Sequence, residues 1–153
     1  MESGQEIIHS SFQRHIREVL ADVGERSVPL DPQVVQAYCE LTGYDYALYS
    51  ARDRVPPGFL MTFTASLFSE MFISFFVRFP DVIKGVIHTA SKVELLGAFR
   101  LSCRQYQVRI EPRNIEEKAG KKGNYFAVDL EALVTDEDGG RVASDIHQFF
   151  LRI

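Results

Sequence analysis

The segment LTGYDYALY (Leu41 to Tyr49) gathers side chains whose types and spacing could do chemistry. Three tyrosines within six positions, Tyr44, Tyr46 and Tyr49, surround the one carboxylate of the segment, Asp45. A tyrosine hydroxyl can donate a proton or a hydrogen bond, but with an unperturbed pKa of about 10 it is a poor base at neutral pH. Asp45 is either the ordinary base of the segment or a solvated carboxylate of a loop, and the three amphipathic rings could line a pocket that holds a ligand.

Three residues outside this segment could also move protons. Glu70 lies near the middle of the apolar segment FLMTFTASLFSEMFISFFVRF (59–79). Burial there would raise the pKa of the carboxyl group and make it a usable base, whereas pairing with an arginine or a place on an exposed edge would leave it structural. His88 and His147 each lie in a segment with strand character, where a single histidine is more often structural than catalytic.

Composition indicates a soluble chain of one domain and excludes several classes of function. The 153 residues are 46% hydrophobic, and the net charge of −4 argues against nucleic acid as a partner, because phosphate binding needs a basic patch. Cys39 and Cys103 have neither metal-binding spacing nor a disulfide framework, so we expect two buried thiols in a reducing compartment. The N-terminus lacks a signal-peptide core, which predicts a cytoplasmic protein. No phosphate-binding loop, nucleophile elbow or set of metal ligands stands out in the sequence, so we expect neither a metal nor a cofactor.

The first half of the chain has helical periodicity. Apolar residues recur at helical spacing from Ile8 to Val23, and Gly24 follows as a stop signal. Asp31-Pro32 is a typical helix start, and Gly43 ends the second helix. The segment 44–58 is expected to be irregular. Segment 59–79 is long enough to cross a bilayer, but a central charge such as Glu70 is costly in lipid, so we expect a helix buried in a soluble protein and no membrane partner.

Alternation replaces helical periodicity from Val86 onward, and it predicts about four strands. In NYFAVDLEALV, one face is apolar and consists of Phe126, Val128, Leu130, Ala132 and Val134. The segment 92–112 is expected to form two strands around Gly97, 113–124 a charged hairpin loop, and 142–153 a closing strand. Helices followed by an antiparallel sheet define an α+β fold.

Three stretches of the sequence together resemble the MaoC-like hot-dog family: VGERSVPLDPQVVQAYCELTGYDYALY, RVPPGFLMTF and VTDEDGGRVASDIHQFFLRI. That family includes (R)-specific enoyl-CoA hydratases and 3-hydroxyacyl-thioester dehydratases. The resemblance extends from about Gly24 to the end and implies a single hot-dog domain over residues 1–153, with 1–23 as an N-terminal helical extension. In such a fold a curved antiparallel sheet wraps a long central helix. Subunits usually pair sheet to sheet, which implies a homodimer or a heterodimer with a catalytic hot-dog subunit.

The hydratase motif of that family, L-T-G-D-x-N-P-x-H, uses its aspartate and histidine to hold one water molecule and move its protons. Here Tyr44 stands at the aspartate position and Tyr49 at the histidine position. A later H-G pair, which supplies a backbone N–H to the thioester oxygen, corresponds to Pro57-Gly58. The resemblance therefore implies thioester binding by Tyr46, Pro57, Gly58 and Phe59. The candidates for catalysis are Tyr44, Asp45, Tyr49 and Glu70.

The resemblance implies a hydratase/dehydratase-type protein that acts on acyl-CoA or acyl-carrier-protein thioesters in fatty acid or polyketide metabolism, with a rebuilt catalytic set. Two alternatives stay open. One is a non-catalytic acyl-thioester-binding or partner subunit, which the tyrosines at the catalytic positions favour. The other is a hot-dog thioesterase that uses Glu70 or Asp45, because other hot-dog branches place a catalytic carboxylate on the central helix.

Overall fold

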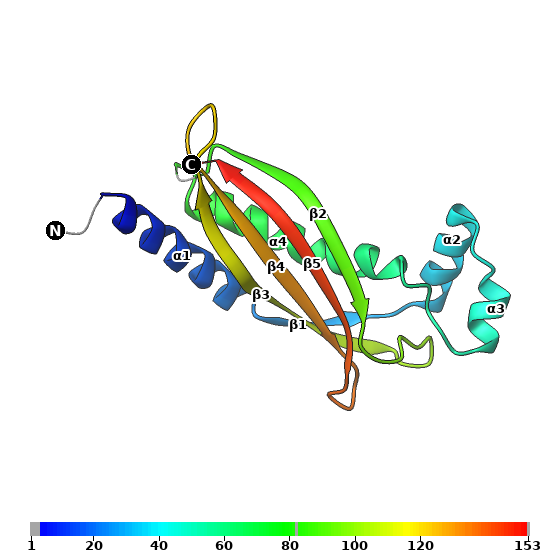
Figure 1. The fold of residues 1–153 in the computed structure, drawn as a ribbon. Coiled ribbons are helices and arrows are strands. Elements are labelled where there is room, and N and C mark those ends of the chain that lie inside the picture. The colour runs from blue at the N-terminus through cyan, green and yellow to red at the C-terminus, as the bar shows by residue number, and fades with distance from the viewer. Residues whose placement is uncertain (1–3, 82, 153) are drawn as a thin grey trace.

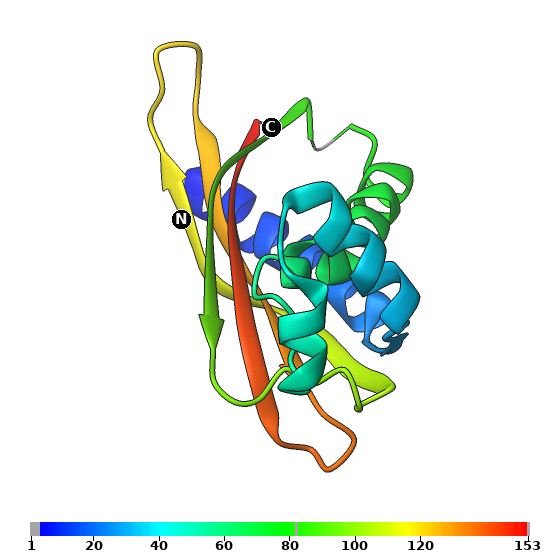
Figure 2. The same cartoon turned by 90° about the vertical axis from the view of Figure 1, so that its right-hand side faces the viewer.

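Helices cover one face of a single antiparallel sheet in this protein, as the computed structural model of residues 4–81 and 83–152 shows (Figure 1). The five strands lie in the order β1-β3-β4-β5-β2, and every neighbouring pair is antiparallel. The elements are α1 (Gly4–Val23), β1 (Glu25–Pro29), α2 (Pro32–Thr42), α3 (Tyr46–Ala51), α4 (Phe59–Arg78), β2 (Gly85–Leu95), β3 (Gln105–Lys118), β4 (Tyr125–Thr135) and β5 (Arg141–Arg152). The predicted α+β class, with a long central helix against a curved sheet, is confirmed (Figure 2).

The long helix α4 forms the centre of the core. Its buried side chains recur at helical spacing and face the sheet: Phe59, Leu60, Phe63, Thr64, Leu67, Phe68, Met71 and Phe75. By length and composition α4 is the one helix among the described residues that could cross a membrane, but these eight side chains pack in the protein core. Its solvent side stays partly apolar, with Met61, Ile73, Phe76 and Val77 exposed. The helix ends at Arg78, before Pro80, which cannot continue it.

Helix α1 packs beside α4 and extends the core. The predicted apolar stripe is buried at Phe12, Ile16, Val19, Leu20 and Val23, while the side chain of Ile8 lies outside the described part of the structure. The ring of Phe12 stacks on Phe126 of β4, with centroids 4.2 Å apart. Fully burying a side chain of this size contributes roughly 1.5–3 kcal/mol, so α1 contributes to the same core as the sheet.

The expected helix boundaries around α2 are confirmed by their hydrogen bonds. The carboxylate of Asp31 accepts a hydrogen bond from the backbone N–H of Gln33 at 2.9 Å, which caps the first turn. Gly43 adopts a left-handed conformation (φ 80°) that glycine reaches without a steric cost, and its N–H closes the helix on the carbonyl oxygen of Cys39.

The predicted face of β4 is confirmed, because Phe126, Val128, Leu130, Ala132 and Val134 are all buried. Other local predictions were wrong. The strand β1 and the short helix α3 were not expected, since β1 is mostly exposed and lacks alternation, and α3 has six residues. Segment 92–112 does not form two strands around Gly97: β2 ends at Leu95, β3 starts at Gln105, and a loop joins them. The hairpin loop is also shorter than predicted, because β3 continues to Lys118.

Both cysteines are free thiols. Cys39 is buried as expected, whereas Cys103 is only partly buried, so that half of the prediction was wrong. Cys103 lies in the loop between β2 and β3, and its Sγ contacts the carbonyl oxygen of Gln105 at 3.1 Å.

Two sets of hydrogen bonds fix the loop 96–104 to the rest of the protein. The buried hydroxyl of Tyr106 donates to the carbonyl oxygen of Arg100 and accepts from the N–H of the same residue. The carboxylate of Asp53 accepts from the hydroxyl of Ser102 at 2.5 Å and from its N–H at 2.8 Å. The hydrogen bond from the Ser102 side chain lowers the pKa of Asp53 below its usual value.

Asp53→Asn is expected to lower the free energy of unfolding by about 1 kcal/mol at pH 7, because the charged acceptor of Ser102 is lost. Asparagine tolerates the left-handed backbone at this position (φ 49°), so the change isolates the carboxylate. Since the folded pKa of Asp53 is depressed, its contribution is present above the unfolded pKa of about 3.9 and is lost as pH falls through the folded value. Urea unfolding between pH 2 and pH 7 measures this, with the exposed Glu137→Gln as control. A difference that stays constant with pH would contradict the charge-based account.

Candidate functional site

The aromatic residues of α2 and α3 meet at the N-terminus of α4. The rings of Tyr38 and Tyr44 stack with centroids 6.1 Å apart, and Tyr49 meets Tyr44 edge to face at 5.8 Å. The edge of Phe59, the first residue of α4, faces Tyr38 at 5.3 Å. We call Tyr38, Tyr44, Tyr49, Gly58 and Phe59 the tyrosine site.

Gly58 is the point on which the tyrosine hydroxyls converge. A Cβ atom at this residue would lie 2.5 Å from the hydroxyl oxygen of Tyr38 and 3.7 Å from that of Tyr44. Gly58 precedes the first turn of α4, where the positive end of the helix dipole lies, and the N–H groups of Phe59 and Leu60 donate to the carbonyl oxygens of Pro56 and Pro57. The site therefore combines hydroxyl donors with a helix terminus that favours a partly negative oxygen atom.

Tyr38 is the residue of the tyrosine site that the sequence did not single out. Burial, and then the neighbouring Tyr44, raise its pKa above the usual value, so the hydroxyl keeps its proton at neutral pH and acts as a donor. The sequence places Tyr38 on the apolar face of α2, which predicts only that its side chain is buried. Its hydroxyl lies close to Gly58 because of the way α2 packs against α4, and the sequence has no pattern for that contact.

Two of the predicted catalytic carboxylates make structural contacts. Asp45 caps α3, where its Oδ1 accepts from the N–H of Leu48 at 3.3 Å. Glu70 is half exposed and pairs with Arg26 of β1, with 2.7 Å between Oε1 and Nη2. Glu70 lies twelve residues beyond Gly58 on α4, about 18 Å along the helix axis, and so does not join the tyrosine site.

The remaining predicted binding residues differ in exposure. Phe59 is buried in the core, Tyr46 packs partly against it, and Pro57 is exposed. Of the residues that the sequence selected, the structure therefore brings together Tyr44, Tyr49, Gly58 and Phe59.

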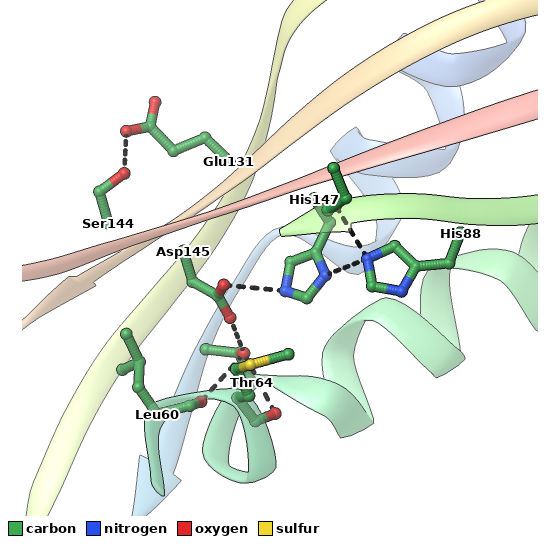
Figure 3. Close-up of polar contacts among 9 residues, drawn as sticks. Leu60, Thr64, His88, Glu131, Ser144, Asp145 and His147 are labelled. Atoms are coloured by element: carbon green, nitrogen blue, oxygen red, sulfur yellow. Dashed lines mark hydrogen bonds and ion pairs between the residues drawn. The ribbon is translucent and has the colours of Figure 1, made fainter. Parts of the chain in front are cut away.

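A second polar group lies further along α4, between the helix and strands β5 and β2 (Figure 3). The hydroxyl of Thr64 donates to Oδ2 of the fully buried Asp145 at 2.5 Å. Oδ1 of Asp145 lies 2.8 Å from Nε2 of His147, an ion-pair distance at an angle outside that of a regular hydrogen bond. Nδ1 of His147 lies 3.0 Å from Nε2 of His88 on β2. We call Thr64, Asp145, His147 and His88 the histidine relay.

Aromatic rings pack against both imidazoles of the histidine relay, and its carboxylate is costly to bury. The ring of His147 lies 4.4 Å from Phe68 of α4, and the ring of His88 lies 5.1 Å from Phe149. Removing a carboxylate from water costs several kcal/mol, and well-packed apolar residues often replace a buried ion pair without loss of stability. Contacts of this kind are therefore weak evidence for a purely structural role. Among the described residues, no group of three or more His, Cys, Asp or Glu side chains is arranged to hold a metal ion.

Sequence reasoning considered His88 and His147 separately and missed Asp145 and Thr64. Asp145 and His147 are two positions apart in β5, so a strand places both on one face, which was the available signal. The pairing with β2 and the contact with α4 had no signal in the sequence, because they join residues 59 and 81 positions apart.

Neither known family models nor curated protein sequences match this chain. Several solved structures, however, are similar to this chain in fold. A chain of the ChsH1-ChsH2 complex from Mycobacterium tuberculosis superposes with a TM-score of 0.67 at 16% identity, over 92% of this chain and 95% of that one. The monoamine oxidase regulatory protein from Archaeoglobus fulgius gives a TM-score of 0.63 at 12% identity, covering 84% and 88%. The C-terminally truncated HadBC (3R-hydroxyacyl-ACP dehydratase) complex from Mycobacterium tuberculosis gives a TM-score of 0.56 at 14% identity, over 84% of this chain and 96% of that one. These likenesses concern the fold, which is the hot-dog fold.

Gly58→Ala is expected to destabilise the protein by about 1–3 kcal/mol, because the new methyl group overlaps the hydroxyl of Tyr38. In a Tyr38→Phe background the same change should be neutral or stabilising by about 0.5 kcal/mol, since the backbone of Gly58 (φ −63°) suits alanine. Chemical unfolding of the four proteins measures the coupling energy. Additive effects would show that the two residues do not touch in solution.

Proposed function

We propose that this protein is a hot-dog acyl-thioester protein of the hydratase/dehydratase type, which binds the thioester of acyl-CoA or of an acyl carrier protein at the tyrosine site. The observation that carries the proposal is the convergence of the Tyr38 and Tyr44 hydroxyls on Gly58 at the N-terminus of α4. The hot-dog fold of a dehydratase complex among the structural neighbours supports the same class of ligand.

The chemistry of the tyrosine site suits a thioester carbonyl. The carbonyl oxygen gains negative charge when the neighbouring carbon atoms react, and fixed donors at a helix N-terminus stabilise that charge. The hydroxyl of Tyr38 fills the space that a side chain at residue 58 would take, so this donor is held beside the backbone at the helix N-terminus. Tyr44 is 41% exposed, so its ring and hydroxyl face the side from which a ligand arrives. The site thus has the parts that bind and polarise a thioester.

The tyrosine site lacks the pair that usually moves protons. Tyr44 and Tyr49 occupy the aspartate and histidine positions of the hydratase motif, and Asp45 is engaged as the cap of α3. The segment 44–49 therefore serves binding in this proposal, and any proton transfer comes from other residues.

Binding is tested with a panel of trans-2-enoyl-CoA and saturated acyl-CoA thioesters. We expect each bound thioester to raise the melting temperature, and Tyr44→Phe to weaken the affinity about fivefold by removing one hydrogen bond. Tyr125→Phe, on the opposite face of the sheet, is the matched control. Loss of enoyl absorbance and release of free thiol are followed in parallel, because thiol release that disappears in Glu70→Gln would favour the thioesterase alternative. No thermal shift with any thioester would reject the proposed function.

A second candidate function is that of a partner subunit, and the exposed edge of the sheet favours it. Strand β2 is an edge strand of eleven residues that carries exposed Ile87 and Leu95. Helix α4 carries exposed apolar side chains of its own, Ile73 and Val77. An edge of this length is a template for strand pairing with another chain. Two of the structural neighbours come from complexes, ChsH1-ChsH2 and HadBC, which supports pairing with a second hot-dog subunit.

We propose a homodimer through the β2 edge, and Ile87→Glu is expected to shift it toward monomers. The reason is that a carboxylate at a residue with 64% exposure costs nothing in the monomer but must be desolvated in the dimer. Light scattering after size-exclusion chromatography gives the molar mass over a range of concentrations. Val34→Glu, at an exposed apolar position of α2, controls for added charge. A variant that remains dimeric would assign the contact to another surface.

A further inference from the structure

A pocket of about 550 Å³ opens on the outer face of the sheet, at the end where β2 begins and β5 finishes. Tyr125 of β4, Phe150 of β5 and Gly85 of β2 line it, together with the hairpin loop between β3 and β4. Both rings point away from the helices, because side chains alternate along a strand and the neighbouring Phe126 and Phe149 contact rings of α1 and α4. The volume lies in the range of roughly 300–1000 Å³ that small-molecule sites occupy.

Cationic side chains surround this pocket: Lys84, Lys121, Lys122 and Arg152. All four are exposed, and none forms an ion pair with another residue that the structure describes, whereas Lys118 of β3 pairs with Glu116 at 3.5 Å. The residues that line the pocket include no acid. In a chain with a net charge of −4 this is a local excess of positive charge, and it favours an anion. We call these four residues, with Gly85, Tyr125 and Phe150, the basic pocket.

The hairpin loop that carries two of the lysines is shaped by glycines. A Cβ atom at Gly120 would lie 2.8 Å from the carbonyl oxygen of Gly123 and 3.2 Å from the ring of Tyr125, so the loop packs directly on this ring. Gly123 has a φ of 115°, a conformation that residues with a side chain rarely adopt. The loop therefore places Lys121 and Lys122 beside the aromatic lining of the pocket.

The rings of Tyr125 and Phe150 form one aromatic surface, with centroids 4.9 Å apart and planes at 45°. Aromatic side chains stack on the planar rings of ligands, and any nucleobase is accepted because each has a π-face. Lysine binds phosphate as a point charge, and the pocket has lysines next to the rings. A nucleoside diphosphate carries both complementary parts, a planar base and phosphate groups, in one molecule.

The basic pocket and the tyrosine site lie at opposite ends of α4 (Figure 1). The 20 residues of this helix span about 30 Å between Gly58 and the turn that leads to Lys84. The basic pocket also opens on the face of the sheet that the helices do not cover. A thioester group bound beside Gly58 therefore does not occupy it in the same chain.

We propose that the basic pocket binds a nucleoside diphosphate, whose base stacks on Tyr125 and Phe150 and whose phosphate groups pair with the four cationic side chains. The nucleotide is a ligand in its own right and not a part of the thioester. The inference goes beyond the proposed function and does not rest on it, because nucleotide binding is measured in the absence of any thioester.

Isothermal titration calorimetry with ADP, adenosine and inorganic pyrophosphate tests the two halves of the basic pocket separately. We expect ADP to bind, and adenosine and pyrophosphate to bind about tenfold or more weakly, because each lacks one of the two complementary parts. Added salt should weaken the binding of ADP and of pyrophosphate but not that of adenosine, since screening acts on charges. Pyrophosphate that binds as tightly as ADP would reduce the pocket to a patch of positive charge and overturn the proposal.

Phe150→Leu keeps an apolar side chain but removes one ring, so it should lower the affinity for ADP about tenfold and leave that for pyrophosphate unchanged. Lys121→Gln combined with Lys122→Gln should weaken both phosphate compounds and leave adenosine unchanged. Lys92→Gln, at an exposed position of β2 outside the basic pocket, is the matched control for the loss of charge. Wild-type affinity for ADP in either of the pocket variants would overturn the proposal.

Gly85→Val tests the place of the ligand without a change of charge. A Cβ atom at Gly85 meets no atom within 4 Å, and the residue is not left-handed, so valine suits the strand and its side chain takes space in the pocket. We expect the affinity for ADP to fall about tenfold or more at an unchanged melting temperature of the free protein. Ala90→Val, on the same strand outside the pocket, is the control. Full ADP binding by Gly85→Val would place the nucleotide elsewhere and overturn the proposal.

Two further comparisons separate this inference from the proposed function. Ile87 of the β2 edge also lines the pocket and stays unchanged in every variant, so that effects on pairing are kept apart. Coenzyme A, which contains a nucleotide, should bind no more tightly than ADP. An affinity about tenfold higher that is lost in Gly85→Val would assign the pocket to the carrier of the thioester and overturn a separate ligand. Thioester binding without any binding of ADP would overturn this inference alone, whereas ADP binding without any thioester binding would reject the proposed function alone.

Discussion

The burial of one side of α4 against the concave face of the sheet is the constraint on which the rest of the molecule depends. One or two side chains in each turn of α4 are removed from water, and they pack in the same core as the apolar faces of β3, β4 and β5. Because interiors are packed densely, the rotation and the axial position of α4 are set by these contacts. Gly58 and Thr64, which lie on the same helix, therefore have fixed places in the fold, and both groups of functional interest are built on them.

The two groups lie at different positions along the same helix. At the N-terminus, the hydroxyls of Tyr38 and Tyr44 converge on Gly58, where the positive end of the helix dipole lies. Further along, Thr64 holds a carboxylate that contacts one imidazole, which in turn contacts a second.

The unpaired edge of β2 connects these observations. The strand carries exposed apolar residues, the bulge at Thr89 and the solvent end of the histidine relay at His88. An edge strand that is left open invites pairing with a second chain, and a bulge in it weakens the ladder of hydrogen bonds. The bulge lies next to His88, whose ring contacts His147 on the neighbouring strand.

The sequence by itself determined much of this protein. Local signals gave the end of α1 and the starts and ends of α2 and α4, and alternation gave the buried face of β4, because periodicity, Asp31 and the glycines after helices act through neighbours in the chain. The family resemblance grouped Gly58, Tyr44 and Tyr49, which the structure brings close together. Only the tertiary structure decided that Tyr38 covers Gly58, that Glu70 pairs with Arg26, and that Thr64, Asp145, His147 and His88 form one chain of contacts. These contacts join distant segments through the packing of α4 and a one-residue shift of register, and neither leaves a periodic pattern in the sequence.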